Sequence, residues 1–270
     1  MSRNATRCLR YGITERGLCL GLRSRRSFPP RVFPVLVLVS LLSCAIPWSR
    51  ALNAGAGAEF TTAFDLASCG FSPAGTNPYF ILLPGYQLVL EGQEDGEALR
   101  VEITVLHDTE MIHLDDLGTV RTRVVEEREW VEGELQEVSR NFYAVCCRTN
   151  AVYYFGEDVD IHEDGEVVSH DGAWRAGQDG AQPGIMMPGM FLLGSRYYQE
   201  TAPDVALDRA EHVAMGLTLT TPAGLFTDCV QVLETTPLDP DAEGFKSYCP
   251  GVGLVVDEVL ELVAYGFVHR

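Results

Sequence analysis

The densest group of side chains that could bind a metal lies between residues 107 and 116. Ten consecutive residues there hold two imidazoles and four carboxylates, which are ligands that divalent cations accept in proteins. The candidate metal ligands are His107, Asp108, His113 and Asp115. The alternative is a polar connection between two strands, because such clusters also arise by chance in a very acidic chain.

A second acidic pattern has the spacing of a calcium-binding loop. Asp160, His162, Asp164 and Asp171 occupy positions 1, 3, 5 and 12 of such a loop, with a glycine at position 6. Histidine is a poor calcium ligand, however, and we expect strands rather than helices on both sides. Asp-Gly between two alternating segments favours a type I′ turn instead, in which His162 faces Val167. We therefore expect a hairpin here.

No sequence pattern typical of a catalytic site is present. The chain lacks the G-x-S-x-G and H-E-x-x-H motifs, the Walker loop and the dinucleotide-binding fingerprint. A catalytic cysteine needs a nearby base, and no histidine stands out for that role. We interpret residues 126–129 as the solvated face of a strand on which Arg128 faces Glu137. The sequence predicts no catalytic residue and no cofactor, and a metal-dependent enzyme is the least favoured function.

An apolar segment of about thirty residues, Gly172–Glu200, is rich in glycine, proline and methionine. Long connections inside compact domains are uncommon and often functional, and flexible methionine side chains suit adaptable binding surfaces. One interpretation is a lid over a cavity that holds a lipid or another apolar ligand. The other is a plug that completes the core. The candidate ligand-binding residues are Trp174, Ile185, Met186, Met187, Met190, Phe191, Tyr197 and Tyr198.

Charge is divided unevenly along the chain. The whole sequence has 38 acidic and 20 basic side chains, a net charge of −18. Nine arginines and one acid lie in residues 1–58, so residues 59–270 hold 37 acidic and 11 basic side chains. Lys246 is the only lysine. A body with this charge repels phosphate backbones, and we expect no nucleic-acid partner.

Residues 1–58 have the parts of an export signal. Basic residues precede the apolar run of residues 32–46, and small residues follow it. The run is shorter than a membrane-spanning helix, which needs about 20 residues, although a retained N-terminal anchor is the alternative. The candidate cleavage sites follow Ala51, Ala54, Ala56 and Ala58. The sequence thus predicts an exported protein of the periplasm, the cell envelope or the medium.

Two features of this leader point to particular routes of export. Leu41-Leu42-Ser43-Cys44 resembles the bacterial lipobox, whose cysteine is lipidated. Cys44 is therefore a candidate for lipidation and for anchoring the protein to a membrane. Arg25 and Arg26 lie in a stretch that resembles the twin-arginine export signal. The sequence leaves the choice between the routes open.

The body contains five cysteines, an odd number that leaves at least one thiol unpaired within a monomer. Adjacent Cys146 and Cys147 would point to opposite faces of a strand, and we expect them to be small buried residues. In a hairpin centred on Asp239, Cys229 faces Cys249 within reach of a disulfide. We expect this disulfide, and the alternative is two buried thiols.

The rest of the body is typical of an antiparallel β protein. Segments rich in Val, Ile, Thr, Tyr and Phe are separated by turns of Gly, Pro, Asp and Asn. Short connections join neighbouring strands in a meander rather than parallel strands through helices. We expect a single mainly-β domain over residues 59–270, after the leader of residues 1–58. Its form is a large curved sheet, a sandwich or an open half-barrel.

Seven stretches of the body support a more specific comparison. They are residues 123–127, 152–158, 169–174, 183–188, 197–200, 235–238 and 248–255. In this order they resemble a family of uncharacterised exported β-rich proteins and lipoproteins of bacteria, over about residues 100–263. The family has a small residue where this chain has Cys249, a departure that fits an extra disulfide. The resemblance implies export and a single domain, and it assigns no activity.

Two classes of function remain open. The first is a non-catalytic binding protein that holds an apolar ligand under the methionine-rich segment. The second is a structural or interaction module of the cell envelope, without a small-molecule site. An empty apolar cavity beneath residues 184–193 would favour the first class, and a filled interior the second.

Overall fold

The computed structural model of the protein describes residues 59–268, which fold almost entirely into β structure. One short 3-10 helix, Leu66–Ser68, precedes the strands. The first nine strands are β1 (Phe71–Ser72), β2 (Gly75–Asn77), β3 (Phe80–Leu82), β4 (Tyr86–Glu94), β5 (Glu97–Leu114), β6 (Gly118–Val131), β7 (Glu134–Cys146), β8 (Val152–Glu163) and β9 (Glu166–Ser169). The others are β10 (Trp174–Arg175), β11 (Gln182–Met187), β12 (Arg196–Tyr198), β13 (Glu200–Thr201), β14 (Arg209–Thr221), β15 (Gly224–Thr236), β16 (Asp239–Cys249), β17 (Gly253–Asp257) and β18 (Leu260–Phe267).

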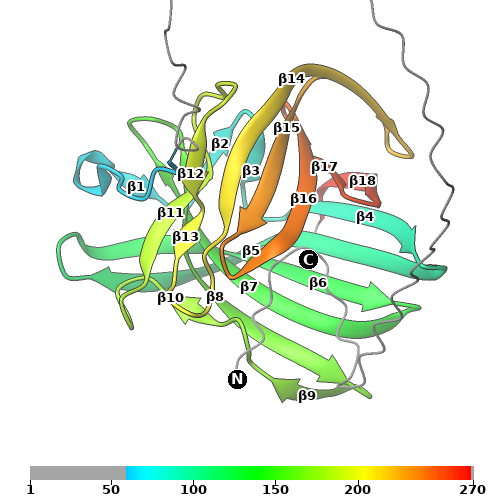
Figure 1. Ribbon diagram of the computed structural model, residues 1–270, viewed down its shortest axis with the longest axis horizontal. Helices are drawn as coiled ribbons and strands as arrows, with labels where there is room; N and C mark the ends of the chain where they lie inside the picture. Colours follow the sequence, from blue (N-terminus) through cyan, green and yellow to red (C-terminus); the bar gives the residue numbers. More distant parts are fainter. Residues whose placement is uncertain (1–58, 269–270) are drawn as a thin grey trace, which may run out of the picture. The chain divides into compact units, whose positions relative to one another are not determined.

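Most of these strands belong to one large antiparallel sheet (Figure 1). Its order is β12-β14-β15-β16-β17-β18-β4-β5-β6-β7-β8-β11-β13, with β1 paired to β7 and with β9 and β10 paired to β8. Two meanders, β4–β8 and β14–β18, are joined where β18 pairs with β4. β2 and β3 form a separate small sheet. The prediction of a mainly-β antiparallel fold is confirmed, in the form of a large curved sheet.

The two ends of this strand order are consecutive pieces of the chain. β12 pairs with β14, and β13 pairs with β11. Only Gln199 separates β12 from β13, and its side chain is buried. One extended segment, residues 196–201, therefore supplies both terminal strands of the order, pairing with β14 through β12 and with β11 through β13.

Irregular pairing bends the long strands. Register shifts interrupt several strand pairs, and extra residues in one strand increase its local twist and bend. In β5, residues 106–108 lie opposite the single residue Val124 of β6. The buried guanidinium of Arg123 donates hydrogen bonds to the carbonyl oxygens of His107 (2.7 Å) and Pro73 (2.8 Å). Arg123 thus satisfies a carbonyl that the bulge removes from the ladder.

The hairpin between β8 and β9 follows the prediction for an Asp-Gly turn. Asp164 and Gly165 have φ values of 52° and 83°, as a type I′ turn requires. His162 faces Val167, as the turn predicts, but the same register would place Asp160 opposite Ser169, and this is wrong because a register shift places Ile161 there. The carboxylate of Asp160 contacts two basic side chains rather than converging with the turn. The structure therefore favours the hairpin over the calcium loop.

A disulfide joins Cys229 of β15 to Cys249 of β16, as the sequence predicts. Residues 230–235 face residues 243–248 in the register on which that prediction rests. The turn itself lies at residues 237–238 rather than around Asp239. The reason is that residues 240–242 form a bulge in β16 beside the turn.

A second disulfide joins Cys69 to Cys146, and the expectation of a buried thiol doublet is wrong. Cys147 is a free thiol, and it is exposed. Neighbouring residues of a strand point to opposite faces, so only one of the two cysteines can face the segment that carries Cys69. That segment lies against β7, because β1 pairs with the end of β7. The disulfide fixes the N-terminal part of the body to the sheet.

Two disulfides indicate that the body folds in an oxidising environment. No helix within residues 59–268 is long and apolar enough to cross a membrane. The expected export signal, the twin-arginine stretch, the candidate cleavage sites and Cys44 lie outside the described residues.

Candidate ligand-binding cavity

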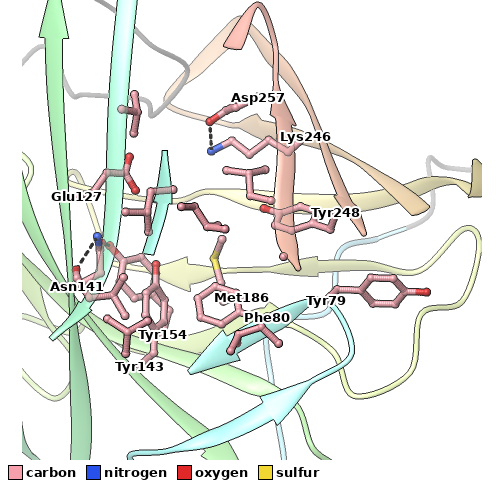
Figure 2. Close-up of a pocket in the computed structure, with 18 of the residues that line it drawn as sticks. Tyr79, Phe80, Glu127, Asn141, Tyr143, Tyr154, Met186, Lys246, Tyr248 and Asp257 are labelled. Atoms are coloured by element: carbon pink, nitrogen blue, oxygen red, sulfur yellow. Dashed lines mark hydrogen bonds and ion pairs between the residues drawn. The ribbon is translucent and has the colours of Figure 1, made fainter. Parts of the chain in front are cut away.

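The inner face of the curved sheet lines a cavity (Figure 2). Its wall comes from β3–β8 on one side and from β15–β17 on the other, and β11 and β13 contribute Met186 and Glu200. About 1260 Å³ within it is free of protein atoms, including the part that is open to solvent. The centre of a water molecule can reach about 130 Å³ of this space. The water-accessible volume is below the roughly 300–1,000 Å³ that is usual for ligand pockets, so the enclosed part of the cavity has room for a small ligand only.

One part of the cavity wall is apolar. Val101, Ile103 and Val105 lie two residues apart on β5 and project from the same face of the strand. Met186 reaches into the cavity from β11 (Figure 2). The other apolar and aromatic residues of the wall are Tyr79, Phe80, Ile81, Tyr86, Leu88, Val125, Tyr143, Tyr154, Tyr248, Val252 and Leu254. This part of the wall can bury the apolar body of a ligand.

The other part of the wall is acidic. Val125, Glu127 and Glu129 share the inward face of β6, so that face changes from apolar to acidic along one strand. Of the described residues that line the cavity, seven are carboxylic acids and one, Lys246, is basic. The acids are Glu127, Glu129, Glu137, Glu200, Asp208, Glu234 and Asp257. The acidic end and the apolar end of the cavity therefore suit chemically different groups.

The interpretation of residues 126–129 as a solvated face is therefore wrong for three of them, because Glu127 and Glu129 line the cavity and Glu126 is 7% exposed. Glu127 and Glu129 point inward, whereas Glu126 accepts a hydrogen bond from Arg128 on the other face of β6. Arg128 does not face Glu137 either, because a register shift next to Glu129 places Glu129 opposite Glu137.

Lys246 lies at the acidic end, between two carboxylates. Its Nζ is 3.2 Å from Oε2 of Glu234 and 3.4 Å from Oδ2 of Asp257. Gln199 donates a hydrogen bond of 2.8 Å to the other oxygen of Glu234. Burial lowers the pKa of Lys246, but the charges of Asp257 and Glu234 outweigh this effect and raise the pKa well above its usual value. Lys246 is therefore a charged ammonium at neutral pH.

Asp257 and Tyr248 share this environment. Burial raises the pKa of Asp257 to about 6; Lys246 opposes the shift, and Glu234 and Glu127 add to it. Burial also raises the pKa of the Tyr248 hydroxyl, again with a contribution from Glu234. One lysine thus only partly compensates the negative charge of its neighbours.

A smaller recess adjoins the acidic end. It shares Glu137, Tyr154, Glu200 and Asp208 with the cavity and is also lined by Trp174. Trp174 is 6% exposed, and its indole N–H has no hydrogen-bond partner within residues 59–268. The centre of a water molecule can reach about 20 Å³ of the recess, which is room for one small polar group.

The sequence-predicted ligand residues have three different locations. Met186 lines the cavity, and Trp174 lines the adjoining recess. Met187, Phe191 and Tyr197 belong to the buried core, and Ile185 packs against it. Tyr198 is half-buried, and Met190 is 81% exposed. The structure thus brings one of the eight residues into the cavity and a second beside it.

Residues 188–195 are held against the body at several points. Nδ2 of Asn77 donates a hydrogen bond of 2.8 Å to the carbonyl oxygen of Pro188. The ring of Phe191 stacks on buried His212 with 3.7 Å between ring centres. Nε2 of His212 lies 2.9 Å from the hydroxyl of Tyr197, and its Nδ1 lies 3.0 Å from the carbonyl oxygen of Leu192. Residues 188–195 therefore act as a plug, and within Gly172–Glu200 it is Met186, on β11, that lines the cavity.

The four candidate metal ligands lie on β5 and in the turn after it, rather than in a loop. His107 and His113 are six residues apart on an extended strand, which separates them by about 20 Å. Asp108 and Asp115 are exposed. Within residues 59–268, no group of three or more His, Cys, Asp or Glu side chains is arranged to hold a metal ion. The structure does not bring these candidates together.

Sequence reasoning missed the acidic end of the cavity. A signal was present in β6, where Val125, Glu127 and Glu129 alternate with Val124 and Glu126. Both faces of this strand carry valine followed by glutamate, so the alternation did not identify the inner face. The only lysine of the chain, Lys246, was a second signal, because a single lysine in an acidic body is expected to pair with carboxylates.

Comparisons of the chain with protein-family models, curated proteins and solved structures gave no match. The function must therefore be argued from the cavity itself.

Proposed function

We propose that the protein is an exported, non-catalytic binding protein that holds an apolar ligand inside its curved sheet. The observation that carries this proposal is the cavity, whose wall combines the aliphatic face of β5 with Met186 and several aromatic rings. A concave site that combines an apolar wall with convergent polar groups is a usual form of small-molecule site. An empty interior of this kind favours a binding protein over a filled structural module.

The chemistry of the cavity fits binding better than catalysis. Lys246 would be the candidate nucleophile, but the neighbouring carboxylates keep it protonated, and an ammonium has no lone pair with which to attack. His212 does not line the cavity. It is buried and takes part in the contacts that hold residues 188–195.

Export is the second part of the proposal. The tripartite leader and the two disulfides support it, and the mature chain is expected to start between Cys44 and Glu59. N-terminal sequencing of protein from the native host, combined with mass measurement for a lipid on Cys44, tests this. Recovery of intact Met1 from a cytosolic fraction would contradict it.

Binding is tested with the neutral apolar dye N-phenyl-1-naphthylamine, whose fluorescence rises in apolar surroundings. The wild-type protein should raise the fluorescence in a saturable way. Met186→Trp, which fills the cavity, should weaken dye binding at least fivefold, whereas Met190→Trp on the exposed part of the same segment should not. Ile103→Trp serves as a second filling variant, and melting curves confirm that each variant is folded.

An interaction module of the cell envelope is the second candidate function. Met190, Leu192 and Leu193 favour it, because these large apolar side chains are exposed together on one loop. The two candidates give different results in the dye experiment. Absence of saturable binding to the wild type, or equal binding by Met186→Trp and Met190→Trp, would contradict the ligand-binding function and leave the interaction module as the better account.

A further inference from the structure

Tyr248 carries a hydroxyl that lines the cavity and that no described residue binds. The residue is 3% exposed, and its ring projects from β16 into the cavity (Figure 2). Within residues 59–268 the hydroxyl makes no hydrogen bond. Unlike the sealed indole N–H of Trp174, it keeps surface that faces the cavity. A buried hydroxyl without a partner is unfavourable, so this one is expected to bond a water molecule or a ligand.

Lys246 provides a second donor on the same wall. It lies two residues before Tyr248 on β16, so both side chains project from one face of the strand. An ammonium has three N–H groups, and two of them face the carboxylates of Glu234 and Asp257. The third has no acceptor within the described part of the chain. The wall therefore offers a ligand one O–H donor and one N–H donor.

A chain of contacts connects these donors to the apolar part of the cavity. One carboxylate oxygen of Glu234 pairs with Lys246, and the other accepts a hydrogen bond of 2.8 Å from Gln199. The same amide nitrogen of Gln199 lies 3.5 Å from the sulfur of Met186. Met186 therefore lies next to the polar group. An apolar chain that packs on Met186 can place its head at Tyr248, which favours a ligand over a lone water molecule.

A charged head fits this place poorly. A cation would be repelled by the ammonium of Lys246 in surroundings where water screens charges weakly. An anion would compete with Glu234 and Asp257, which already hold that ammonium, and would lie near Glu127, whose charge acts on both Lys246 and Asp257. A carbonyl oxygen adds no charge. It has two lone pairs for two donors and brings no donor of its own.

We infer that the ligand is a small neutral carbonyl compound, an apolar chain that carries a ketone or an ester at one end. This inference rests on the proposed binding function. The chain lies against Met186 and the aliphatic face of β5. Tyr248 donates its O–H to the carbonyl oxygen, and Lys246 stabilises the same oxygen with its positive charge. The small enclosed volume of the cavity favours a chain of modest length.

Four probes with nine carbons each separate the possible heads: nonane, 2-nonanone, nonanoate and nonylamine. Each is used to displace N-phenyl-1-naphthylamine from the full chain at pH 7.5, below its solubility limit. We expect nonane and 2-nonanone to displace the dye in a saturable way. Nonanoate and nonylamine should both bind more weakly than 2-nonanone.

Two matched variants locate the hydrogen bond. Tyr248→Phe removes only the hydroxyl, and it should weaken 2-nonanone about fivefold while leaving nonane unchanged. Tyr265→Phe removes the hydroxyl of an exposed tyrosine outside the cavity and should change neither. Infrared spectra of 2-nonanone with a carbon-13 label at the carbonyl give a direct readout. The carbonyl stretch of the bound ketone should lie at lower frequency in the wild type than in Tyr248→Phe, because a hydrogen bond weakens the C=O bond.

The outcomes are distinguishable. If the dye does not bind or none of the four probes displaces it, the proposed binding function fails and the inference fails with it. If nonane displaces the dye but Tyr248→Phe leaves the affinity and the carbonyl stretch of 2-nonanone unchanged, the binding function stands and the carbonyl head is wrong. Tighter binding of nonanoate or nonylamine than of 2-nonanone would overturn the neutral head. Equal weakening of nonane and 2-nonanone by Tyr248→Phe would show that the hydroxyl only shapes the cavity, which also overturns the inference.

Discussion

Lys246 and Asp257 face each other on β16 and β17, and their side chains form an ion pair of 3.4 Å inside the cavity. Glu234 completes the group from β15, with 3.2 Å between its carboxylate and the ammonium. Three consecutive strands of one meander therefore supply the only lysine and two of its acidic partners. An arrangement of this kind makes the stability of the fold sensitive to pH.

Asp257 should stabilise the fold more at pH 5 than at pH 7. Its pKa in the folded protein is about 6, above the ordinary value of 3.8. Between these values the folded state binds more protons than the unfolded state, so this contribution grows as the pH falls. From pH 7 to pH 5 the free energy of unfolding of the wild type should rise by about 1 kcal/mol relative to Asp257→Asn. Urea unfolding at both pH values measures the difference. Parallel pH dependences of the two proteins would contradict it.

Protonation of His212 should destabilise the fold as the pH falls. Burial lowers the pKa of its imidazole from 6.5 to about 4, although the hydrogen bond to Leu192 opposes this shift. The unfolded state binds more protons than the folded state between these values, so stability present above pH 6.5 is lost as the pH falls towards 4. From pH 7.5 to pH 5 the wild type should lose about 2 kcal/mol relative to His212→Gln.

The readout for His212 is local as well as global. Gly194 donates its N–H to the carbonyl oxygen of His212 (2.9 Å). Amide exchange at Gly194 should accelerate below pH 6, after correction for the intrinsic pH dependence of exchange. Unchanged protection in the wild type down to pH 4.5 would show that this histidine does not control residues 188–195.

The two disulfides should contribute unequally to stability. Cys69–Cys146 spans 77 residues and Cys229–Cys249 spans 20. Closing the longer loop restricts the unfolded chain more, by about 4 kcal/mol against about 3 kcal/mol in the chain-entropy model. Replacing each pair by serines and measuring guanidinium unfolding gives the order. Cys147→Ser is the control with an exposed thiol and should be close to neutral. The reverse order would show that strain or residual structure dominates.

Gly189 is required for the close approach of the methionine-rich segment to the body. A Cβ atom at this position would collide with the backbone carbonyl of Thr149, which cannot move aside like a flexible side chain. Gly189→Ala should destabilise the protein by more than about 2 kcal/mol and expose the ring of Phe191. Gly70→Ala, where a Cβ meets no atom within 4 Å, is the matched control. Equal melting temperatures of the two variants would contradict this account.

The sequence was sufficient for the hairpins whose turns have a strong local signature. Asp164-Gly165 predicts both the turn and the pairing of His162 with Val167, because glycine and aspartate tolerate positive φ. The pairing of Cys229 with Cys249 follows from the same logic, since facing residues of a hairpin have a fixed relation in sequence.

Pairings that depend on bulges or on distant segments could not be predicted. A register shift next to Glu129 moves Glu137 away from Arg128, and no local sequence pattern predicts this shift. Cys69 reaches Cys146 from a segment that no hairpin connects to β7. The acidic cavity was missed for a different reason. Inward glutamates look like solvent-facing ones when both faces of a strand carry valine and glutamate, as in β6.

The strand order also determines when the cavity can form during folding. β4–β8 can pair as soon as they have emerged, but β4 receives its second neighbour only when β18, the last strand, is present. β12 likewise gains its partner only when β14 has emerged. Contacts between opposite ends of a chain form slowly, because a long loop must close first. The cavity is thus a late product of folding, and it forms only in the compartment where the C-terminus arrives.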